Sequence, residues 1–581
     1  MPSLRLIAAA VAAAILAPAT PAFAGDPIMP LSQVRSGMQC EGLSVMRGTE
    51  PASFAVQVDD VIDGDPSLTG PRILVTVSGP AVDSTGVGPG FSGSPIYCPD
   101  AEGVRRVIGA ISEGIGEYGG DVALATPIEE ILAVDPRAPG TRAAAALASA
   151  SRARSGRLPG PVLPLTAPVT VSGLSTPVAR ALSSTARRRG RTILAAPAGP
   201  ADSFPRQTLR PGSAMSVGLS SGDINIGAVG TVAYTDGDRV WGFGHGYENL
   251  GARSLLLQDA YVFRVIENPN VGGDAGSTYK LAVGGHNLGT ISNDELSAVA
   301  GTLGGLPRTV GVHLYGEDGD TGRTTESHSV VADESPVIGP GASPVSFVAP
   351  LAATQLVTSL LRSAPGRLFG RMCATIRLAV VERPLRICNR YVSAWPDDSG
   401  FGNVIAERAG TDLADALMII DSYRFGDLGV EDVGARITLQ RGVRLAYLRS
   451  VKAPARVRAG QTIRLRVRSQ LVGGGRHMAP VTVRLPERLR RGVRRLVLRG
   501  TEPDTGGELF ADLIEEFVEF DGAADDSAGP ATVEEVVERV RRLSRYDGVR
   551  VRIGRGKAVP AFRSERLRIA GQVSTRVRVV R

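Results

Sequence analysis

The segment GVGPGFSGSPIYC (residues 86–98) combines glycine and serine in a pattern that suits nucleophilic catalysis. A serine nucleophile needs a general base within hydrogen-bond reach and backbone N–H groups aimed at the developing oxyanion. Gly90 and Gly93 flank Ser92, so the backbone there can approach a substrate carbonyl without a Cβ in the way. The pattern predicts Ser92 as the nucleophile and the Gly90 and Ser92 amides as the oxyanion hole. The alternative is an ordinary turn, the role we assign to Ser94 because a proline follows it.

The general base must come from a small set, because the chain has five histidines. His245 lies in WGFGHGYENLG, at the expected end of a strand and among glycines, where a side chain can face a cleft. His286 in VGGHNLG lacks the preceding aromatic strand, His313 is expected in an apolar strand, and His328 and His477 in polar loops. We therefore select His245 as the candidate base. The alternative is a structural histidine, the commoner role at a strand end.

The elements that must position these residues are mostly short β-rich runs, punctuated by glycine and proline in a spacing typical of barrels and sandwiches. We expect a mainly β fold with some α. The chain divides into a signal peptide (1–24), a β-barrel-like subdomain with the serine motif (25–137), a flexible Ala/Ser/Arg/Pro linker (138–164), a second β-rich subdomain with the histidine motif (165–345), a mixed α/β connecting region (346–442) and a C-terminal β-rich, sandwich-like domain with helices (443–581).

Two helix starts carry capping-box patterns, in which a threonine is followed three residues later by glutamate. Thr126 with Glu129 predicts a short helix at the end of the first subdomain, and Thr532 with Glu535 predicts one near the C-terminus. Apolar periodicity predicts a further helix over 351–361. We expect no segment after residue 24 to be long and apolar enough to cross a bilayer.

The first 24 residues, MPSLRLIAAAVAAAILAPATPAFA, have the features of a secretory signal peptide. Arg5 gives the positive start, an apolar run follows, and small residues precede a cleavage site near Ala24. We expect export, with the mature chain secreted or held in the cell envelope. A retained N-terminal anchor is the alternative.

The four cysteines favour two disulfides in an exported chain. Local pairing of Cys40 with Cys98 and of Cys373 with Cys388 is the simplest of three connectivities, and buried free thiols are the alternative. No cysteine and histidine spacing resembles a zinc site. We expect no metal and no cofactor.

Composition and charge limit the classes of partner that the protein can bind. The 581 residues predict several domains, and the net charge of +7 is modest for that length. Arginine is dense in VRLPERLRRGVRRLVLRG (483–500), but aromatic residues do not interleave with it. This pattern indicates a solvated strand face rather than a nucleic-acid groove. We expect no nucleic-acid partner, and contact with a cell-envelope component stays open.

Several stretches together resemble the SpoIVB-type peptidase S55 domain. They are MPLSQVRSGMQCEGLSVMRGTEPASFAVQV, GVGPGFSGSPIY, GAIS and ATPIEEIL, and IGAVGTVAYTDGDRVWGFGH is similar to the family segment that ends in its catalytic histidine. The resemblance spans roughly residues 29–345. It implies a secreted serine endopeptidase with a trypsin-like double β-barrel, Ser92 as nucleophile, His245 as base and a protein or peptide as substrate.

This chain departs from the family pattern in three ways. Ser92 precedes His245, whereas SpoIVB, the sporulation protease that typifies the family, has the reverse order, so we expect a rearranged double barrel. Triads tolerate any chain order because geometry defines them. No PDZ-like segment separates the motifs. The third triad member has no assignment, because Ser78 stands where the family has an aspartate, with Asp83 nearby.

Two functions remain in competition. The first is an exported S55-type serine endopeptidase, which the family resemblance favours. The second is a catalytically weak or inactive module on the same scaffold that binds peptides or cell-envelope components. The missing acid, the motif order and the large C-terminal β region favour the second.

Overall fold

The computed structural model describes residues 25–64, 70–115, 120–137, 162–164, 169–188, 192–196, 204–267, 278–334, 343–361, 367–393, 404–504, 529–564 and 567–580. The chain is mainly β, with 52% of residues in strands and 15% in helices, which confirms the expected class. The expected signal peptide lies outside the described residues. The expected linker does too, apart from its last three residues.

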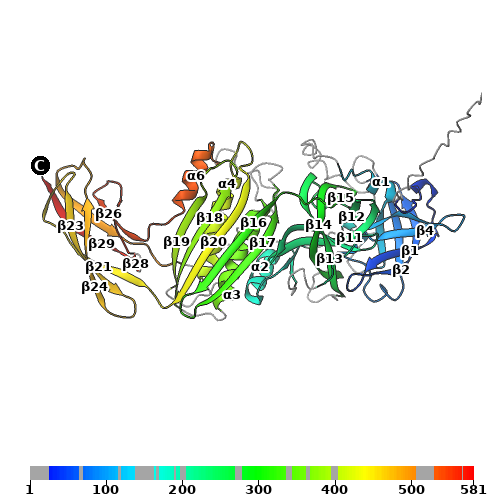
Figure 1. Ribbon diagram of the computed structural model, residues 1–581, viewed down its shortest axis with the longest axis horizontal. Helices are drawn as coiled ribbons and strands as arrows, with labels where there is room; N and C mark the ends of the chain where they lie inside the picture. The colour runs from blue at the N-terminus through cyan, green and yellow to red at the C-terminus, as the bar shows by residue number, and fades with distance from the viewer. Residues whose placement is uncertain are drawn as a thin grey trace, which may run out of the picture.

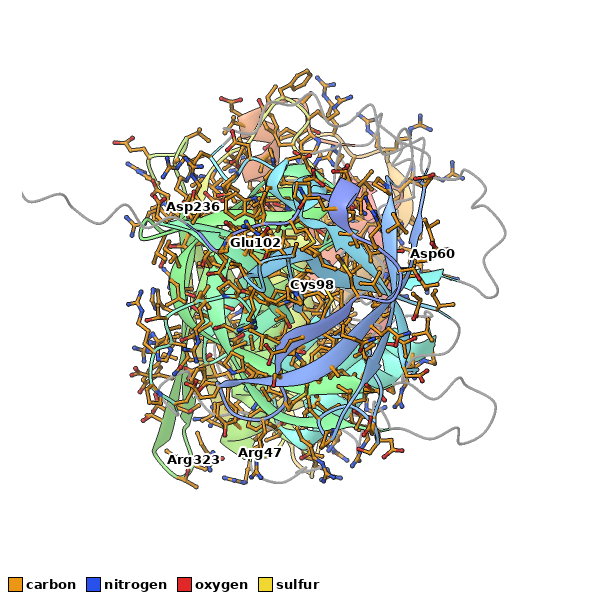
Figure 2. The ribbon with its side chains drawn as sticks, turned by 90° about the vertical axis from the view of Figure 1, so that its right-hand side faces the viewer. Arg47, Asp60, Cys98, Glu102, Asp236 and Arg323 are labelled. Atoms are coloured by element: carbon orange, nitrogen blue, oxygen red, sulfur yellow. A yellow bond between two sulfur atoms is a disulfide. The ribbon has the colours of Figure 1, made fainter. Side chains whose placement is uncertain are left out.

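The first subdomain is a closed barrel of six strands, seen at the blue end of Figure 1. Hydrogen bonding runs in the order β1-β2-β3-β6-β5-β4, and the pairing of β4 with β5 closes the ring. Phe54, Val56 and Val58 alternate inward along β2, as a half-buried strand requires. In an end-on view Cys98 lies among the strands while Asp60 lies at the rim (Figure 2). The strands are β1 (Gln39–Val45), β2 (Pro51–Ile62), β3 (Arg72–Ser78), β4 (Pro95–Pro99), β5 (Arg105–Ile115) and β6 (Val122–Pro127); η1 (Leu31–Gln33) precedes them, α1 (Ile128–Leu132) follows, and β7 (Val162–Pro164) pairs with β5.

The second subdomain also closes into a ring of six strands, in the order β10-β13-β14-β15-β12-β11, with β11 returning to β10. Strands β11 and β12 form a hairpin that pairs Asp236 with Arg239, and Gly237 takes a positive φ of 63° in its turn. On β11 the sheet continues through β8 (Val169–Ser172) to β9 (Ile193–Ala195), with α2 (Thr176–Arg188) between them in the chain. The ring strands are β10 (Ala214–Gly222), β11 (Asn225–Asp236), β12 (Arg239–Gly242), β13 (Gly251–Ile266), β14 (Tyr279–Glu295) and β15 (Ala298–Leu303).

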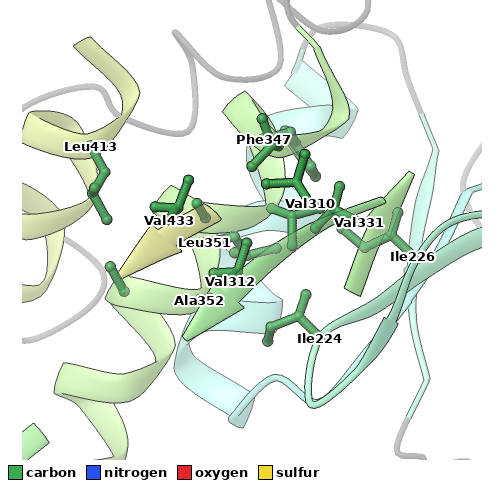
Figure 3. Close-up of a cluster of buried hydrophobic side chains, with 14 of the residues drawn as sticks. Ile224, Ile226, Val310, Val312, Val331, Phe347, Leu351, Ala352, Leu413 and Val433 are labelled. Carbon is green, nitrogen blue, oxygen red and sulfur yellow. The ribbon is translucent and has the colours of Figure 1, made fainter. Parts of the chain in front are cut away.

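Beyond β10 the same sheet continues in the order β17-β16-β20-β18-β19 and is covered by helices. Figure 3 shows Phe347 and Leu351 of α3 packed against Val310 of β16 and Val331 of β17. These elements are β16 (Thr309–Asp318), β17 (Arg323–Ala332), α3 (Pro344–Leu361), β18 (Leu368–Leu378), β19 (Leu385–Ser393), α4 (Val404–Asp421) and β20 (Val430–Arg441).

Helix α3 contradicts the expectation that no segment after residue 24 is long and apolar enough to cross a bilayer. It begins seven residues earlier than the periodicity predicted, at Pro344, and by length and composition it could cross a membrane. Most of its surface is buried against β16, β17 and α4. It therefore also fits the description of a core helix, whose all-round hydrophobicity reflects burial on every side.

The C-terminal region forms two sheets that share one apolar core. Ile463, Leu465 and Val467 of β23 point inward, while the arginines between them are exposed, as expected of a solvated strand face. Helix α6 (Val533–Arg542) packs on α4 and β19 instead of on this sandwich. The strands are β21 (Leu445–Lys452), β22 (Arg456–Arg458), β23 (Thr462–Leu471), β24 (Arg476–Arg484), β25 (Gly492–Arg499), β26 (Gly548–Ile553), β27 (Val559–Arg563), β28 (Arg568–Ala570) and β29 (Gln572–Val580).

Both predicted disulfides are present. Cys40 of β1 is bonded to Cys98 of β4, and Cys373 of β18 is bonded to Cys388 of β19. The first bridge joins two neighbouring strands of the first barrel, and β4 directly follows the serine segment. It therefore restrains the strand on which that segment ends.

The two capping predictions have different outcomes. Thr532 caps α6 as predicted, since its hydroxyl accepts a hydrogen bond from the Glu535 amide. The prediction at Thr126 was wrong: α1 begins at Ile128 without a side-chain cap. The Thr126 hydroxyl instead donates to the carbonyl of Gly244, at 2.6 Å, in the second barrel. A contact between barrels replaces the local cap.

Candidate active site

The serine segment is a buried loop between β3 and β4, held against the second barrel. Ser92 has no exposed surface, and its backbone carbonyl accepts a hydrogen bond from the Thr231 amide of β11 at 2.8 Å. Gly90 and Gly93 have φ values of +95° and +90°. A Cβ on Gly93 would lie 1.9 Å from the Thr231 carbonyl oxygen, so only glycine fits where the two barrels touch.

The backbone amides of this loop fall into two groups. The N–H groups of Phe91, Gly93 and Ser94 donate to the carbonyls of Gly88, Ile111 and Phe91. Among the described residues, the Gly90 and Ser92 amides have no backbone acceptor. A buried N–H without an acceptor is rare in folded proteins. These two amides are the pair that the sequence predicts as an oxyanion hole.

His245 follows β12 and is 5% exposed. Its ring Nδ1 lies 2.7 Å from the Gly246 carbonyl oxygen, which can only accept, so Nδ1 carries the proton and Nε2 keeps its lone pair. Burial lowers the pKa of His245, which favours this neutral form. Phe243, just before it, has a φ of +67°, a strained conformation for a non-glycine residue.

Both segments are fixed to the same point of β11. Thr231 donates its amide to the Ser92 carbonyl, and its own carbonyl accepts from the Phe243 amide at 3.2 Å. A Cβ on Gly93 would lie 2.6 Å from the Phe243 nitrogen. The serine loop of the first barrel and the segment leading to His245 in the second are therefore in direct contact.

Ser92 and His245 each have a buried polar atom without a hydrogen-bond partner in the described part of the chain, so the two are not hydrogen-bonded to each other. These atoms are the Ser92 Oγ and the His245 Nε2. The hydroxyl can donate, and Nε2, as assigned above, can only accept. The two atoms are chemically complementary.

No carboxylate orients His245 among the described residues, since its Nδ1 bonds to a backbone carbonyl. Burial lowers the pKa of His245, while the hydrogen bond to the Gly246 carbonyl and then the charges of Glu113 and Asp294 act in the opposite direction. Glu113 is paired with Arg72, and Asp294 with Arg253. The residues considered from the sequence do not fill this role. Ser78 ends β3, and Asp83 accepts from the Gly79 amide in a turn.

The other four histidines lie elsewhere. His286 bonds through Nδ1 to the buried Asp259. His313 of β16 and His328 of β17 face each other across neighbouring strands, and His477 lies in β24. The expectation of polar loops for His328 and His477 was therefore wrong. No group of three or more His, Cys, Asp or Glu side chains that could hold a metal ion occurs among the described residues.

Lys280 is a site residue that the sequence did not reveal. It lies in β14 of the second barrel and is 4% exposed. Its Nζ donates to the Ser44 hydroxyl at 2.6 Å and to the Thr231 hydroxyl at 3.3 Å, and lies 4.4 Å from the centre of the Phe91 ring. Burial lowers its pKa to about 7. A lysine in an alternating strand carries no sequence signal of this kind.

No family model matches the chain, and no match was found among the curated proteins or the solved structures. The functional argument therefore depends on the local geometry of Ser92, His245 and the backbone around them.

Proposed function

We propose that the protein is an exported serine endopeptidase of the S55 type, with Ser92 as nucleophile and His245 as general base. The observation that carries the proposal is a pair of buried, complementary atoms, Ser92 Oγ and His245 Nε2, which have no hydrogen-bond partner among the described residues and belong to two segments that contact the same residue of β11. The two free amides beside Ser92 add the donors that acyl transfer requires.

In this mechanism the neutral His245 takes the Ser92 proton at Nε2 as the hydroxyl oxygen attacks the scissile carbonyl. The Gly90 and Ser92 N–H groups donate to the oxyanion of the tetrahedral intermediate. The imidazolium then returns the proton to the leaving amine. Water, activated by the same imidazole, hydrolyses the acyl-enzyme. The substrate is a protein or peptide, and no cofactor takes part.

The Gly246 carbonyl takes the place that an aspartate has in the common triad. It fixes the tautomer of His245, which is one function of that aspartate. It carries no net charge, so it stabilises the imidazolium less than a carboxylate does. We therefore propose a low turnover compared with a complete triad.

The export part of the proposal is supported by the two disulfides, which persist in oxidising compartments. Together with the signal-like N-terminus they favour a secreted or envelope-bound mature chain.

The second candidate is an inactive module that binds peptides or envelope components. The observation that favours it is the complete burial of Ser92, because a peptide carbonyl cannot reach a side chain without exposed surface unless the loop or its neighbours move. The two candidates differ in whether Ser92 reacts.

A fluorophosphonate probe reacts covalently with activated serines and therefore distinguishes the two candidate functions. The mature folded protein should be labelled at Ser92, and both Ser92→Ala and His245→Ala should abolish labelling. Ser94→Ala should still be labelled at Ser92, although more slowly, because Ser94 is not the nucleophile but its hydroxyl donates to the Phe91 carbonyl beside it. Ser220→Ala, which removes a buried hydroxyl from β10, is the control for loss of a buried polar group. Equal labelling of wild type and Ser92→Ala would refute the assignment. No labelling of folded wild type would favour the binding module.

A further inference from the structure

The two oxyanion-hole amides belong to peptide groups whose carbonyls are held from behind. In a planar trans peptide the C=O and N–H point in opposite directions. The direction of the Gly90 N–H is therefore set by the Pro89 carbonyl, and that of the Ser92 N–H by the Phe91 carbonyl. Whatever holds these two carbonyls determines whether the hole exists.

The Pro89 carbonyl is held by the backbone of Lys280. The Lys280 amide donates to it at 3.0 Å. The Lys280 side chain also packs on the same peptide, because a Cβ on Gly90 would lie 2.9 Å from the Lys280 Cβ. The first hole donor is thus oriented by a strand of the opposite barrel.

The Phe91 carbonyl accepts two hydrogen bonds from Ser94, one from its amide at 2.9 Å and one from its hydroxyl, and the hydroxyl is the end of a chain that begins at the Lys280 side chain. The Ser94 hydroxyl lies 2.6 Å from the Phe91 oxygen and 2.8 Å from the Ser44 hydroxyl. Ser94 has one proton, and the carbonyl can only accept, so Ser94 donates to Phe91 and Ser44 donates to Ser94. The Ser44 oxygen then accepts from Lys280 Nζ at 2.6 Å.

A second branch from the same amine ends on the neighbouring peptide. Lys280 Nζ donates to the Thr231 hydroxyl, which donates to the Gly90 carbonyl at 3.1 Å. Both branches run from the amine towards backbone carbonyls of the serine loop. Every hydroxyl proton in the cluster is used, which is what a fully satisfied buried network requires.

We propose that Lys280 is a positioning residue that sets the oxyanion hole, acting on Pro89 through its backbone and on Phe91 through Ser44 and Ser94. This inference rests on the proposed peptidase function, which it extends. Lys280 belongs to the second barrel and the hole to the first, so the hole is complete only when the barrels are docked. Lys280 contacts no carboxylate among the described residues, and burial of such a lysine is unfavourable for folding. The orienting role accounts for its presence.

The test uses Ser94→Ala, which removes the hydroxyl donor to the Phe91 carbonyl, and Lys280→Met, which removes the amine at the start of the chain but keeps the backbone N–H. The Ser94 amide stays as a donor to the Phe91 carbonyl in both variants. Crystal structures of both full-length variants should show the Phe91–Ser92 peptide turned from its wild-type orientation, while the Pro89–Gly90 peptide stays in place. The second-order rate of fluorophosphonate labelling should fall, by up to the 10²–10³-fold that loss of one hole donor produces. Ser220→Ala, the buried-hydroxyl control, should label like wild type.

The orientation of the Phe91–Ser92 peptide and the rate of fluorophosphonate labelling together separate this inference from the peptidase proposal. A Phe91–Ser92 peptide that keeps its orientation in both variants overturns the role of Lys280, whether or not wild type is labelled. A rotated peptide together with an unlabelled wild type supports the role of Lys280 and refutes the peptidase. A melting temperature of Lys280→Met at or above that of wild type, with slower labelling, excludes general unfolding as the cause.

Discussion

Replacing Lys280 by methionine should stabilise the double barrel at neutral pH, and the size of the effect follows from its burial. The pKa of Lys280 falls from 10.5 in the unfolded chain to about 7 in the folded one. That difference of 3.5 units corresponds to about 5 kcal/mol at pH values below 7, where the lysine is protonated in both states. Loss of the hydrogen bonds to the two hydroxyls subtracts about 1–2 kcal/mol. Lys280→Met should therefore be more stable than wild type by about 3 kcal/mol at pH 7.

The pH dependence gives the sharper test. Between pH 7 and 10.5 the unfolded lysine binds a proton that the folded one does not, so wild-type stability rises with pH in this window. From pH 7 to 9.5 the rise is about 3 kcal/mol, and the variant should lack it. The contacts of the amine are the Ser44 and Thr231 hydroxyls and the Phe91 ring, and no charged group contributes to the shift among the described residues.

Differential scanning calorimetry across this pH range measures the effect, because it resolves the transitions of separate domains. The transition of the C-terminal sandwich serves as the internal control and should be the same in both proteins. Parallel stability curves for wild type and Lys280→Met between pH 7 and 9.5 would show that the buried amine does not titrate as the structure implies.

Further predictions concern the general base His245, the Cys40–Cys98 disulfide and the contact of Gly93 with the second barrel. Because burial lowers the pKa of His245, fluorophosphonate labelling should rise with pH through a midpoint below the usual 6.5, and a midpoint above 7 would contradict the assignment. The double change Cys40→Ala and Cys98→Ala should destabilise the first barrel by about 2–5 kcal/mol in calorimetry and slow labelling, without shifting the sandwich transition. Gly93→Ala should abolish labelling, because its Cβ would lie 1.9 Å from a backbone oxygen of the other barrel. Gly304→Ala, which also has a positive φ but no atom within 4 Å, should retain labelling.

Local patterns in the sequence were sufficient for much of the fold. Alternating apolar residues predicted the strands, as in Phe54, Val56 and Val58 of β2, because one face of each strand must be buried. The cysteines were paired correctly because each pair brackets a short segment, and Cys40 and Cys98 lie on adjacent strands of one barrel. The glycines around Ser92 were interpreted as leaving room for a substrate carbonyl, whereas a Cβ on Gly93 would meet the Thr231 carbonyl oxygen of the other barrel, a contact that the sequence did not indicate.

Features decided by tertiary contacts were not predictable in this way. The capping box at Thr126 and Glu129 is locally sound, but the threonine bonds to Gly244 and the glutamate accepts from the Leu31 amide. In YKLAV the alternation suggests that Tyr279 and Leu281 face inward and Lys280 outward. The structure has the opposite arrangement, because Lys280 and Ala282 are buried. Only closure of the barrels reveals which face of β14 is inside.

Unpaired buried atoms alone do not identify a catalytic site in this chain. Within the ranges that the structure describes, the Ser216 Oγ and the Gln258 Oε1 are also buried without partners, and these residues pair across β10 and β13. Each such group is unfavourable by about 1–3 kcal/mol. Ser92 differs because the Gly90 and Ser92 amides of its loop have no backbone acceptor among the described residues. The carbonyls of the same two peptide groups, those of Pro89 and Phe91, are held by hydrogen bonds. A turn with a purely structural role has no need to leave two buried amides without a backbone acceptor, among the described residues, beside an unpaired hydroxyl. It is this combination, and not burial of the serine, that favours catalysis over a binding module.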